Sequence, residues 1–332
     1  MTSGAVMVPT VTGGVRSDEL GMTLMHEHIF ILSPELEHNY PEAWDEEERV
    51  AEAVRKLRAA KEKGIDSILD LTVLGLGRDI PLIQRVAEQV DVNIIIATGA
   101  YVTTALPLPF VFQDPKGPLG KREVLIEMFE RDAYEGVAHT GVRAAVIKCA
   151  SDVAGLTHDV ERVLRAVARV HETTNLPIFT HTDAASRGGL EQQRIFREEG
   201  VDLGRVVIGH CGDTSDLDYL RELIAEGSYV GMDRFGLYNL LDYDTRLEIV
   251  ARLCSEGYAS RLLLSHDASC YLRWGDELRE LAPHWHYSHL VEKVLPGLRR
   301  LGVSTAQIDE MLITNPRTIL ETGALRPREK GV

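Results

Sequence analysis

Apolar and charged segments alternate along almost the whole chain. Short apolar runs rich in β-branched residues have the length of buried parallel strands and lack the strict alternation of a half-exposed sheet. These eight predicted strands cover residues 22–30, 67–73, 93–99, 144–150, 177–183, 205–213, 228–234 and 261–267. The charged segments between them have helical spacing, most clearly at residues 45–64, 121–137, 159–173 and 244–257. Gly64 suits the C-cap of the first of these helices.

The regular alternation of strand and helix predicts an α/β protein with a (β/α)8 TIM barrel rather than an open doubly wound sheet. The sequence contains no internal repeat, low-complexity tract or composition break that would mark a linker. We therefore interpret residues 1–332 as a single barrel domain. Two long loops, at residues 107–120 and 268–288, interrupt the pattern. Long loops in a compact fold usually act as lids or binding loops.

Composition narrows the class of protein. The 332 residues are 44% hydrophobic and 26% charged, which suits a globular protein with a large core. The formal net charge of −15 argues against nucleic acid or an anionic membrane as the main partner. The N-terminal segment does not resemble a signal peptide, and no run approaches the roughly 18 apolar residues of a membrane helix. We expect a soluble cytoplasmic protein, and its widely spaced cysteines fit reduced thiols.

Titratable side chains gather at the ends of the predicted strands. Two histidines lie two residues apart in the first strand, so both leave the backbone on the same face. The carboxyl ends of barrel strands meet at one mouth, where barrel enzymes keep their active sites. Burying such groups together is costly unless they are paired or bind metal. The set consists of His26, His28, Lys148, His181, His210 and Asp267.

This mixture of four imidazoles, a carboxylate and a lysine predicts a site for two metal ions. It suits zinc, cobalt, manganese or iron, and is too rich in nitrogen for calcium or magnesium. An ordinary lysine ammonium group offers no acceptor to a metal. A deprotonated amine can react with carbon dioxide to give a carbamate, whose two oxygens can bridge two cations. We therefore hypothesise N6-carboxylysine at Lys148 and two divalent ions, with zinc as the first expectation.

In chain order, these six residues resemble the metal ligands of the phosphotriesterase branch of the amidohydrolase superfamily. The resemblance covers nearly the whole chain, from "LMHEH" near the start to "SHD" near the end. Within that branch the chain is most similar to the phosphotriesterase-like lactonases. Tyr101 after the third strand, Arg234 in "GMDRFG" and Trp274 in the last long loop support this narrower match. A short seventh loop and a long eighth loop also resemble the lactonases more than the dedicated organophosphate hydrolases.

The resemblance implies two adjoining metal positions. The more buried metal would be held by His26, His28 and Asp267. The more exposed metal would be held by His181 and His210, and carboxylated Lys148 would bridge the pair. A hydroxide between the two metals is then the expected nucleophile.

Catalytic roles also follow from the resemblance. Asp267 would accept the proton of the attacking hydroxide and pass it to the leaving alkoxide. Tyr101 would hydrogen bond to the lactone carbonyl, while Arg234 and Trp274 would shape the pocket. We expect an enzyme that opens acyl-homoserine lactones or other γ- and δ-lactones. Organophosphate hydrolysis is expected as a side activity, because its transition state also places negative charge on an oxygen. The resemblance further implies a homodimer.

Other interpretations stay open. Each histidine taken alone could be a packed core or surface residue. Lys148 alone could form a salt bridge with Asp267, Tyr101 could be an ordinary loop aromatic, and Arg234 could pair with Asp233 or its neighbours. A dedicated phosphotriesterase, or another esterase or amidase of the superfamily, would keep the same ligands and differ in its loops. A non-catalytic metal-binding protein or a structural protein is a further class.

Another histidine pair and two neighbours of the proposed ligands also need an interpretation. His284 and His286 repeat the spacing of the first pair but follow a proline in a loop, where packing is the favoured interpretation. Glu27 and His266 are neighbours of proposed ligands in predicted strands. Because side chains alternate along a strand, we expect both to point away from the metal site, towards the helices.

Overall fold

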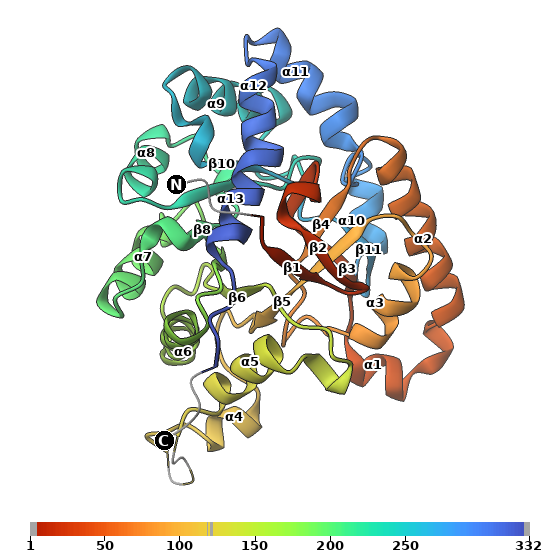
Figure 1. Ribbon diagram of the computed structural model, residues 1–332, viewed down its shortest axis with the longest axis vertical. Coiled ribbons are helices and arrows are strands. Elements are labelled where there is room, and N and C mark those ends of the chain that lie inside the picture. The colour runs from red at the N-terminus through yellow and green to blue at the C-terminus, as the bar shows by residue number, and fades with distance from the viewer. Residues whose placement is uncertain (1–4, 118, 120–121, 329–332) are drawn as a thin grey trace.

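A parallel sheet curls into a barrel and forms the centre of the computed structural model, which describes residues 5–117, 119 and 122–328 (Figure 1). Its nine strands are ordered β10, β9, β8, β7, β6, β5, β4, β3, β11. Their bounds are β3 Thr23–Ile31, β4 Ser67–Asp70, β5 Asn93–Gly99, β6 Val146–Ala150, β7 Ile178–His181, β8 Val206–Ile208, β9 Tyr229–Met232, β10 Leu262–Leu264 and β11 Ser269–Leu272. The predicted (β/α)8 barrel is confirmed.

The eighth barrel strand is divided into two short pieces. β10 pairs with β9, and β11 pairs with β3 on the other side of the seam. Between the pieces, the backbone N–H of Asp267 donates to the carbonyl of His26 at 3.0 Å, and that of His28 donates to Ala268 at 2.9 Å. β3 is nine residues long and extends past β4, so its last residues need hydrogen-bond partners that β11 provides. These bonds close the barrel.

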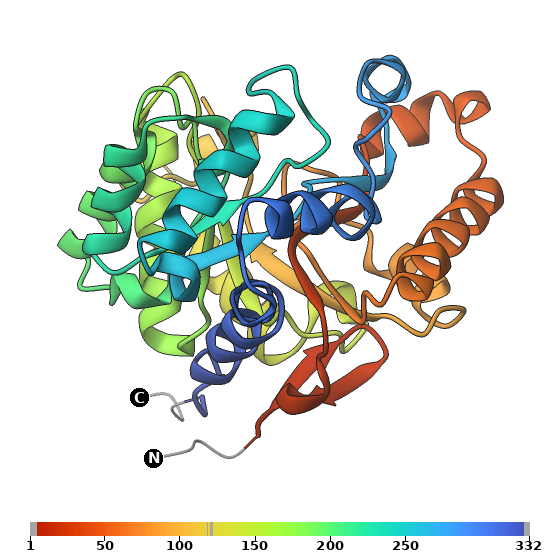
Figure 2. The same ribbon diagram turned by 90° about the horizontal axis from the view of Figure 1, so that it is seen from above.

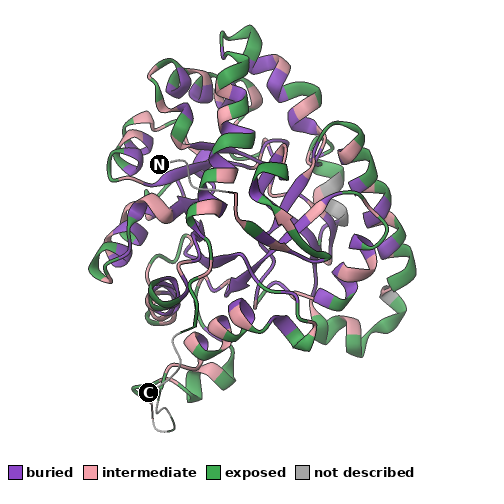
Figure 3. Ribbon diagram, viewed as in Figure 1, coloured by how far each residue is buried: buried purple, intermediate pink, exposed green. Residues whose placement is uncertain are grey.

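Helices surround the barrel, and their buried faces lie towards the strands (Figure 3). The long ones begin at side-chain caps, as where Asp45 accepts a hydrogen bond from the N–H of Glu48. The helices are α1 Pro34–Asn39, α2 Glu46–Glu62, α3 Ile80–Ala87, α4 Leu108–Phe112, α5 Val124–Tyr134, α6 His158–Thr174, α7 Gly188–Glu198, α8 Leu217–Ala225, α9 Tyr243–Ser255, α10 Asp276–Leu281, α11 Leu295–Arg300, α12 Thr305–Asp309 and α13 Asn315–Thr322. Among the described residues, no helix is long and apolar enough to cross a bilayer.

Both segments expected to be loops contain regular structure. Residues 107–120 were expected to be a loop because of their prolines and glycines, yet they include α4. Its prolines, Pro107 and Pro109, occupy the N-cap and the first turn, where a missing N–H costs nothing. The segment 268–288 includes β11 and α10. β11 escapes prediction because its pairing with β3 is a long-range interaction.

A short hairpin closes the barrel at the amino ends of the strands. It consists of β1 (Met7–Thr10) and β2 (Gly13–Arg16), and Figure 2 shows it beside α13 at the end opposite the strand-end loops. Val8 of the hairpin and Leu320 of α13 pack in one cluster with Leu69 and Phe179 from inside the barrel. The interior of the barrel at its amino end is therefore filled by packed side chains.

Gly99, at the end of β5, tests how tightly the strands pack. Its φ is +122°, and a methyl group at this position would overlap the backbone of Lys148. We expect Gly99→Ala to lower the free energy of unfolding by about 3 kcal/mol, through left-handed strain and overpacking together. Gly200, at φ +79° with open space around it, is the control, and Gly200→Ala should cost about 1 kcal/mol. Urea unfolding followed by circular dichroism measures both, and equal losses would contradict the packing argument.

Candidate metal centre

Six titratable side chains from five strand ends meet at the carboxyl end of the barrel. Nε2 of His26 lies 2.9 Å from Nζ of Lys148, and Nε2 of His28 lies 3.1 Å from a carboxylate oxygen of Asp267. On the opposite side, Nε2 of His210 lies 2.8 Å from Nδ1 of His181. The four imidazoles and the lysine are buried, and the Asp267 side chain is 14% exposed. The structure therefore brings together all six residues proposed as metal ligands.

Each imidazole has one ring nitrogen bound to an outer partner, so that its other nitrogen faces the cluster. Nδ1 of His26 and Nδ1 of His210 both lie 2.8 Å from the carboxylate of Asp233. Nδ1 of His28 lies 2.8 Å from the hydroxyl of Thr72. His181 is turned the other way, with Nε2 at 3.2 Å from Asp152. A hydrogen-bond partner on the outer nitrogen fixes the tautomer of a metal-binding histidine. The four inward-facing imidazole nitrogens therefore fit divalent metal ions.

The protonation states also suit metal binding. Burial, reinforced by the charge on Lys148, lowers the pKa of His26 to about 4. Burial likewise lowers the pKa of Lys148 to about 8. A neutral imidazole is the form that binds metal, and a neutral amine is the form that reacts with carbon dioxide. Nζ also donates a hydrogen bond to the carbonyl of Thr180 at 3.2 Å, which holds the side chain in place.

Asp267 remains ionised although it is largely buried. Burial alone would raise its pKa, but the neighbouring His210 and the hydrogen bond with His28 hold the pKa well below its ordinary value. Nε of Arg234 donates to the same carboxylate at 3.0 Å, and its Nη1 donates to Asp213 at 2.8 Å. Arg234 is therefore paired with these two carboxylates.

Three residues of the site have left-handed backbone conformations. The φ angles are +59° at His210, +64° at Arg234 and +57° at Asp267. Each of these residues lies just after a strand, where the chain turns away from the barrel. Such conformations cost roughly 1–3 kcal/mol in a residue with a side chain, and they persist only where surrounding contacts hold them. Contacts within the site must therefore hold these three residues in place.

A cavity of about 230 Å³ opens above the cluster. Tyr101, Arg234 and Trp274 all line it, and the Tyr101 ring lies 5.1 Å from the ring of His181. Burial raises the pKa of Tyr101 to about 12, so its hydroxyl stays protonated and can donate. Trp274 is 59% exposed at the mouth. Most other walls are apolar and comprise Ile31, Leu76, Leu237, Leu272, Leu278 and Trp285.

Several supporting residues escaped sequence reasoning. The sequence suggests Asp233 only as a partner for Arg234, whereas its carboxylate lies against the imidazoles of His26 and His210. Its position at the end of β9, among other strand-end polar residues, was the available signal. Thr72, Asp152 and Asp213 follow strands in the same way, but their partners come from distant parts of the chain.

The other histidines lie outside the cluster. His284 and His286 pack around His289, with ring centroids 5.3 and 5.8 Å away, which agrees with a packing role. Nδ1 of His266 lies 2.7 Å from Glu27, and both side chains are fully buried. Both therefore point away from the six clustered residues, in agreement with strand alternation.

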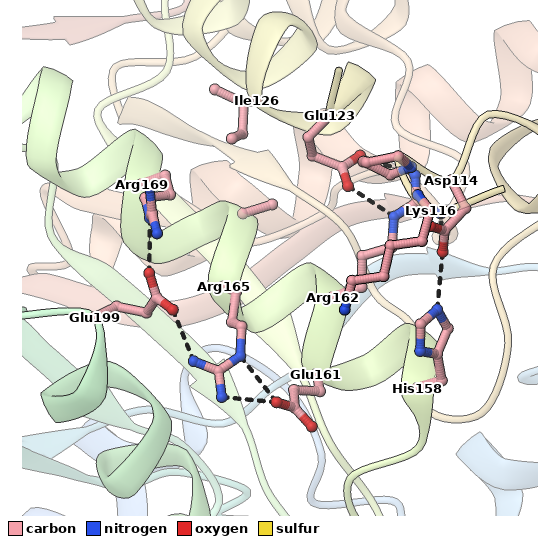
Figure 4. Close-up of a pocket in the computed structure, with 12 residues that line it drawn as sticks. Asp114, Lys116, Glu123, Ile126, His158, Glu161, Arg162, Arg165, Arg169 and Glu199 are labelled. Carbon is pink, nitrogen blue, oxygen red and sulfur yellow. Dashed lines mark hydrogen bonds and ion pairs between the residues drawn. The ribbon is translucent and has the colours of Figure 1, made fainter. Parts of the chain in front are cut away.

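A second cavity, of about 340 Å³, lies beside α6 (Figure 4). Its walls are charged, but the charges bind each other, as where Arg162 forms a two-pronged pair with Glu123. Arg165 donates to both Glu161 and Glu199. These ion pairs join neighbouring elements on the outer surface, and we interpret the cavity as structural. The barrel mouth remains the candidate functional site.

Comparison with known proteins agrees with the geometry of the site. A family model described as the phosphotriesterase family matches residues 6–320. The chain belongs to the phosphotriesterase family. It is therefore a hydrolase of that family, and its (β/α)8 barrel carries His and Asp groups able to hold metal.

Relatives in this family cover nearly the whole chain. A phosphotriesterase homology protein of Mycobacterium tuberculosis is 52% identical over 315 residues, which are 94% of this chain and 97% of the relative. An aryldialkylphosphatase of Saccharolobus solfataricus is 37% identical over 91% of this chain and 96% of its own length. The solved phosphotriesterase from Mycobacterium tuberculosis superposes with a TM-score of 0.94 at 50% identity, over 96% of this chain and 99% of that chain.

Glu27 holds the strand end that carries Asp267. Its carboxylate accepts from Nδ1 of His266 at 2.7 Å, from the backbone N–H of His266 at 2.9 Å and from that of Ala268 at 2.8 Å. We expect Glu27→Ala to lower the free energy of unfolding by about 3 kcal/mol or more, because it leaves buried donors unpaired. Urea unfolding measures the loss. Glu191→Ala, which removes an exposed partner of Arg194, is the control and should change stability by less than about 0.5 kcal/mol. Similar values for both variants would contradict the structural role of Glu27.

Proposed function

We propose that this chain is a metal-dependent lactonase that opens acyl-homoserine lactones or other γ- and δ-lactones, with weaker phosphotriester hydrolysis. The observation that carries the proposal is the contrast within the cavity. Its floor is the polar cluster, and its walls are largely leucine, isoleucine and tryptophan side chains. A lactone with an apolar chain matches this arrangement, because its ring ester needs polar groups and its chain needs apolar walls.

The proposed cofactors are two divalent metal ions, zinc first, with cobalt, manganese or iron as alternatives. His26, His28 and Asp267 would hold one ion, His181 and His210 would hold the other, and N6-carboxylysine at Lys148 would bridge them. Bound divalent ions lower the pKa of coordinated water towards neutrality and polarise an ester carbonyl. The fit rests on the ring nitrogens that face the cluster, which are Nε2 of His26, His28 and His210 and Nδ1 of His181, while the other nitrogen of each ring is held by an outer partner.

The chain's own residues supply proton transfer and orientation. Asp267 is ionised, so it can accept a proton from the nucleophile and return it to the alkoxide that leaves when the ring opens. Arg234 donates to one oxygen of Asp267 and so fixes the direction of this carboxylate. Tyr101 keeps its proton and can donate a hydrogen bond to the lactone carbonyl, where negative charge develops. Trp274 covers the open side of the cavity and would contact the apolar chain of the substrate.

A second candidate is preferred phosphotriester hydrolysis. The names of the relatives favour it, since one is an aryldialkylphosphatase and another a phosphotriesterase homology protein. The same donors could stabilise the phosphoryl oxygen of a triester. Another ester or amide is the remaining alternative.

The cellular compartment and the oligomeric state of the enzyme are also proposals. All four cysteines are buried thiols outside disulfides, which supports a reducing compartment such as the cytoplasm. Homodimer formation stays a prediction from the family resemblance.

The substrate class is tested by direct comparison. Purified protein reconstituted with zinc or cobalt would be assayed with γ-lactones, δ-lactones, acyl-homoserine lactones and a phosphotriester. We expect kcat/KM for the best lactone to exceed that for the phosphotriester by orders of magnitude, and chelation to abolish both activities. A preference for the phosphotriester would favour the second candidate. Absence of lactone turnover with two metals bound would reject the lactonase proposal.

The bridging role of Lys148 has its own test. We expect Lys148→Ala to lose nearly all activity, and a short carboxylic acid in the buffer to restore part of it by replacing the carbamate oxygens. Metal analysis and turnover measure both effects. Lys63→Ala, which removes an exposed partner of Glu292, is the control and should keep full activity. Unchanged turnover in Lys148→Ala would reject the bridge.

A further inference from the structure

Asp233 stands between two histidines that come from opposite sides of the barrel. Its side chain is 1% exposed, and each of its oxygens serves a different imidazole. Oδ2 lies 2.8 Å from Nδ1 of His26 on β3, and Oδ1 lies 2.8 Å from Nδ1 of His210 just after β8. The backbone N–H of His210 donates to Oδ1 at 2.9 Å. One carboxylate therefore fixes two rings and one strand end.

These hydrogen bonds determine which nitrogen of each ring is free. A carboxylate accepts, so the Nδ1 atom of each ring must carry the proton and Nε2 keeps its lone pair. In the proposed two-metal site, His26 belongs to the more buried position and His210 to the more exposed one. Asp233 therefore orients one ligand of each metal.

We propose that Asp233 is a positioning residue that couples the two metal positions, by holding one imidazole of each in the tautomer that binds metal. This inference rests on the proposed two-metal function and goes beyond its ligand set. Removal of the carboxylate should lower the affinity for metal at both positions, although Asp233 itself is not one of the proposed ligands.

The surroundings leave this carboxylate little freedom to move. A methyl group on Gly231 would come within 2.7 Å of Oδ2, so the neighbouring chain is packed against the carboxylate. The Asp233 carbonyl accepts from the buried guanidinium of Arg246 at 3.4 Å, which holds the backbone. The position therefore suits a short carboxylate and has no room for a longer one.

The other supporting residues differ because each serves one ring. The hydroxyl of Thr72 lies against His28, and the carboxylate of Asp152 lies against His181. Thr72→Val keeps the size of its side chain and removes only the hydroxyl beside His28. It is the matched control, since it should affect one metal position and not the other.

The experiment compares Asp233→Ala, Thr72→Val and wild type after removal of metal. An alanine removes both carboxylate oxygens, so neither Nδ1–H group keeps its acceptor. Zinc and cobalt binding would be measured by competition with a chromophoric chelator, with cobalt absorption as a second signal. We expect both stepwise affinities to fall about 10- to 100-fold in Asp233→Ala, and only one to fall in Thr72→Val.

The possible outcomes separate this inference from the proposed function. Two ions in wild type, with one or neither affinity changed in Asp233→Ala, would overturn the coupling role alone. Fewer than two ions in wild type would overturn the proposed function and this inference with it. A measurement on metal-free wild type does not depend on the folding of a variant. Nitrogen NMR of labelled histidines should show Nδ1–H tautomers at His26 and His210, and an Nε2–H tautomer at either would overturn the proposal.

Discussion

The structure depends on one constraint, which is that polar groups buried at the carboxyl end of the barrel must all be satisfied. Five of the six clustered residues are fully buried, and burial penalises every charged or unpaired group among them. The carboxylate of Asp233 binds one nitrogen in each of two rings, and the hydroxyl of Thr72 and the carboxylate of Asp152 each bind one nitrogen of a further ring. The other nitrogen of each ring then faces the centre of the cluster, near Lys148 or another imidazole. The hydrogen bonds to the outer nitrogens thus determine which nitrogens could bind a metal. The metal centre is in this sense a consequence of how the barrel end is hydrogen bonded.

β3 contributes both to the cluster of titratable residues and to the closure of the barrel. Its inward residues, His26 and His28, belong to the cluster, whereas Glu27 between them faces outward and binds the backbone around Asp267. The same seam that closes the barrel therefore sets the distance between the first strand and the last. Asp267 needs this support because its φ of +57° is unfavourable by itself. Closure of the fold and placement of its carboxylate are thus parts of a single hydrogen-bonded arrangement.

The sequence reveals those parts of the molecule that depend on local pattern. Runs of apolar residues predict the strands, and ligand-type residues at strand ends predict a metal site, because the barrel brings those ends together by topology alone. β11 and the left-handed angles at His210 and Arg234 depend on contacts between distant segments, so no local pattern predicts them. α4 is missed for a different reason, because its prolines suggest a loop although they occupy the start of a helix. The role of Asp233 is hidden for the same reason, since it is defined by a histidine more than 200 residues earlier in the chain.

Chemistry and substrate choice are built from different parts of this fold. The polar floor lies on strand ends, where backbone hydrogen bonding leaves little freedom, and such a floor suits a whole family of ester and phosphoester hydrolases. Ile31 and Leu272 of the walls belong to β3 and β11, but the other apolar wall residues lie in the connections that follow the strands. Such connections generally vary in length and composition more readily than strands do. Trp285 connects the two parts, because its ring lines the cavity while its indole N–H donates to the carbonyl of His266 at 2.7 Å. A change in the last loop can therefore alter both the shape of the cavity and the strand end that carries Asp267, so the sequence of this loop is constrained by the geometry of that strand end as well as by the cavity.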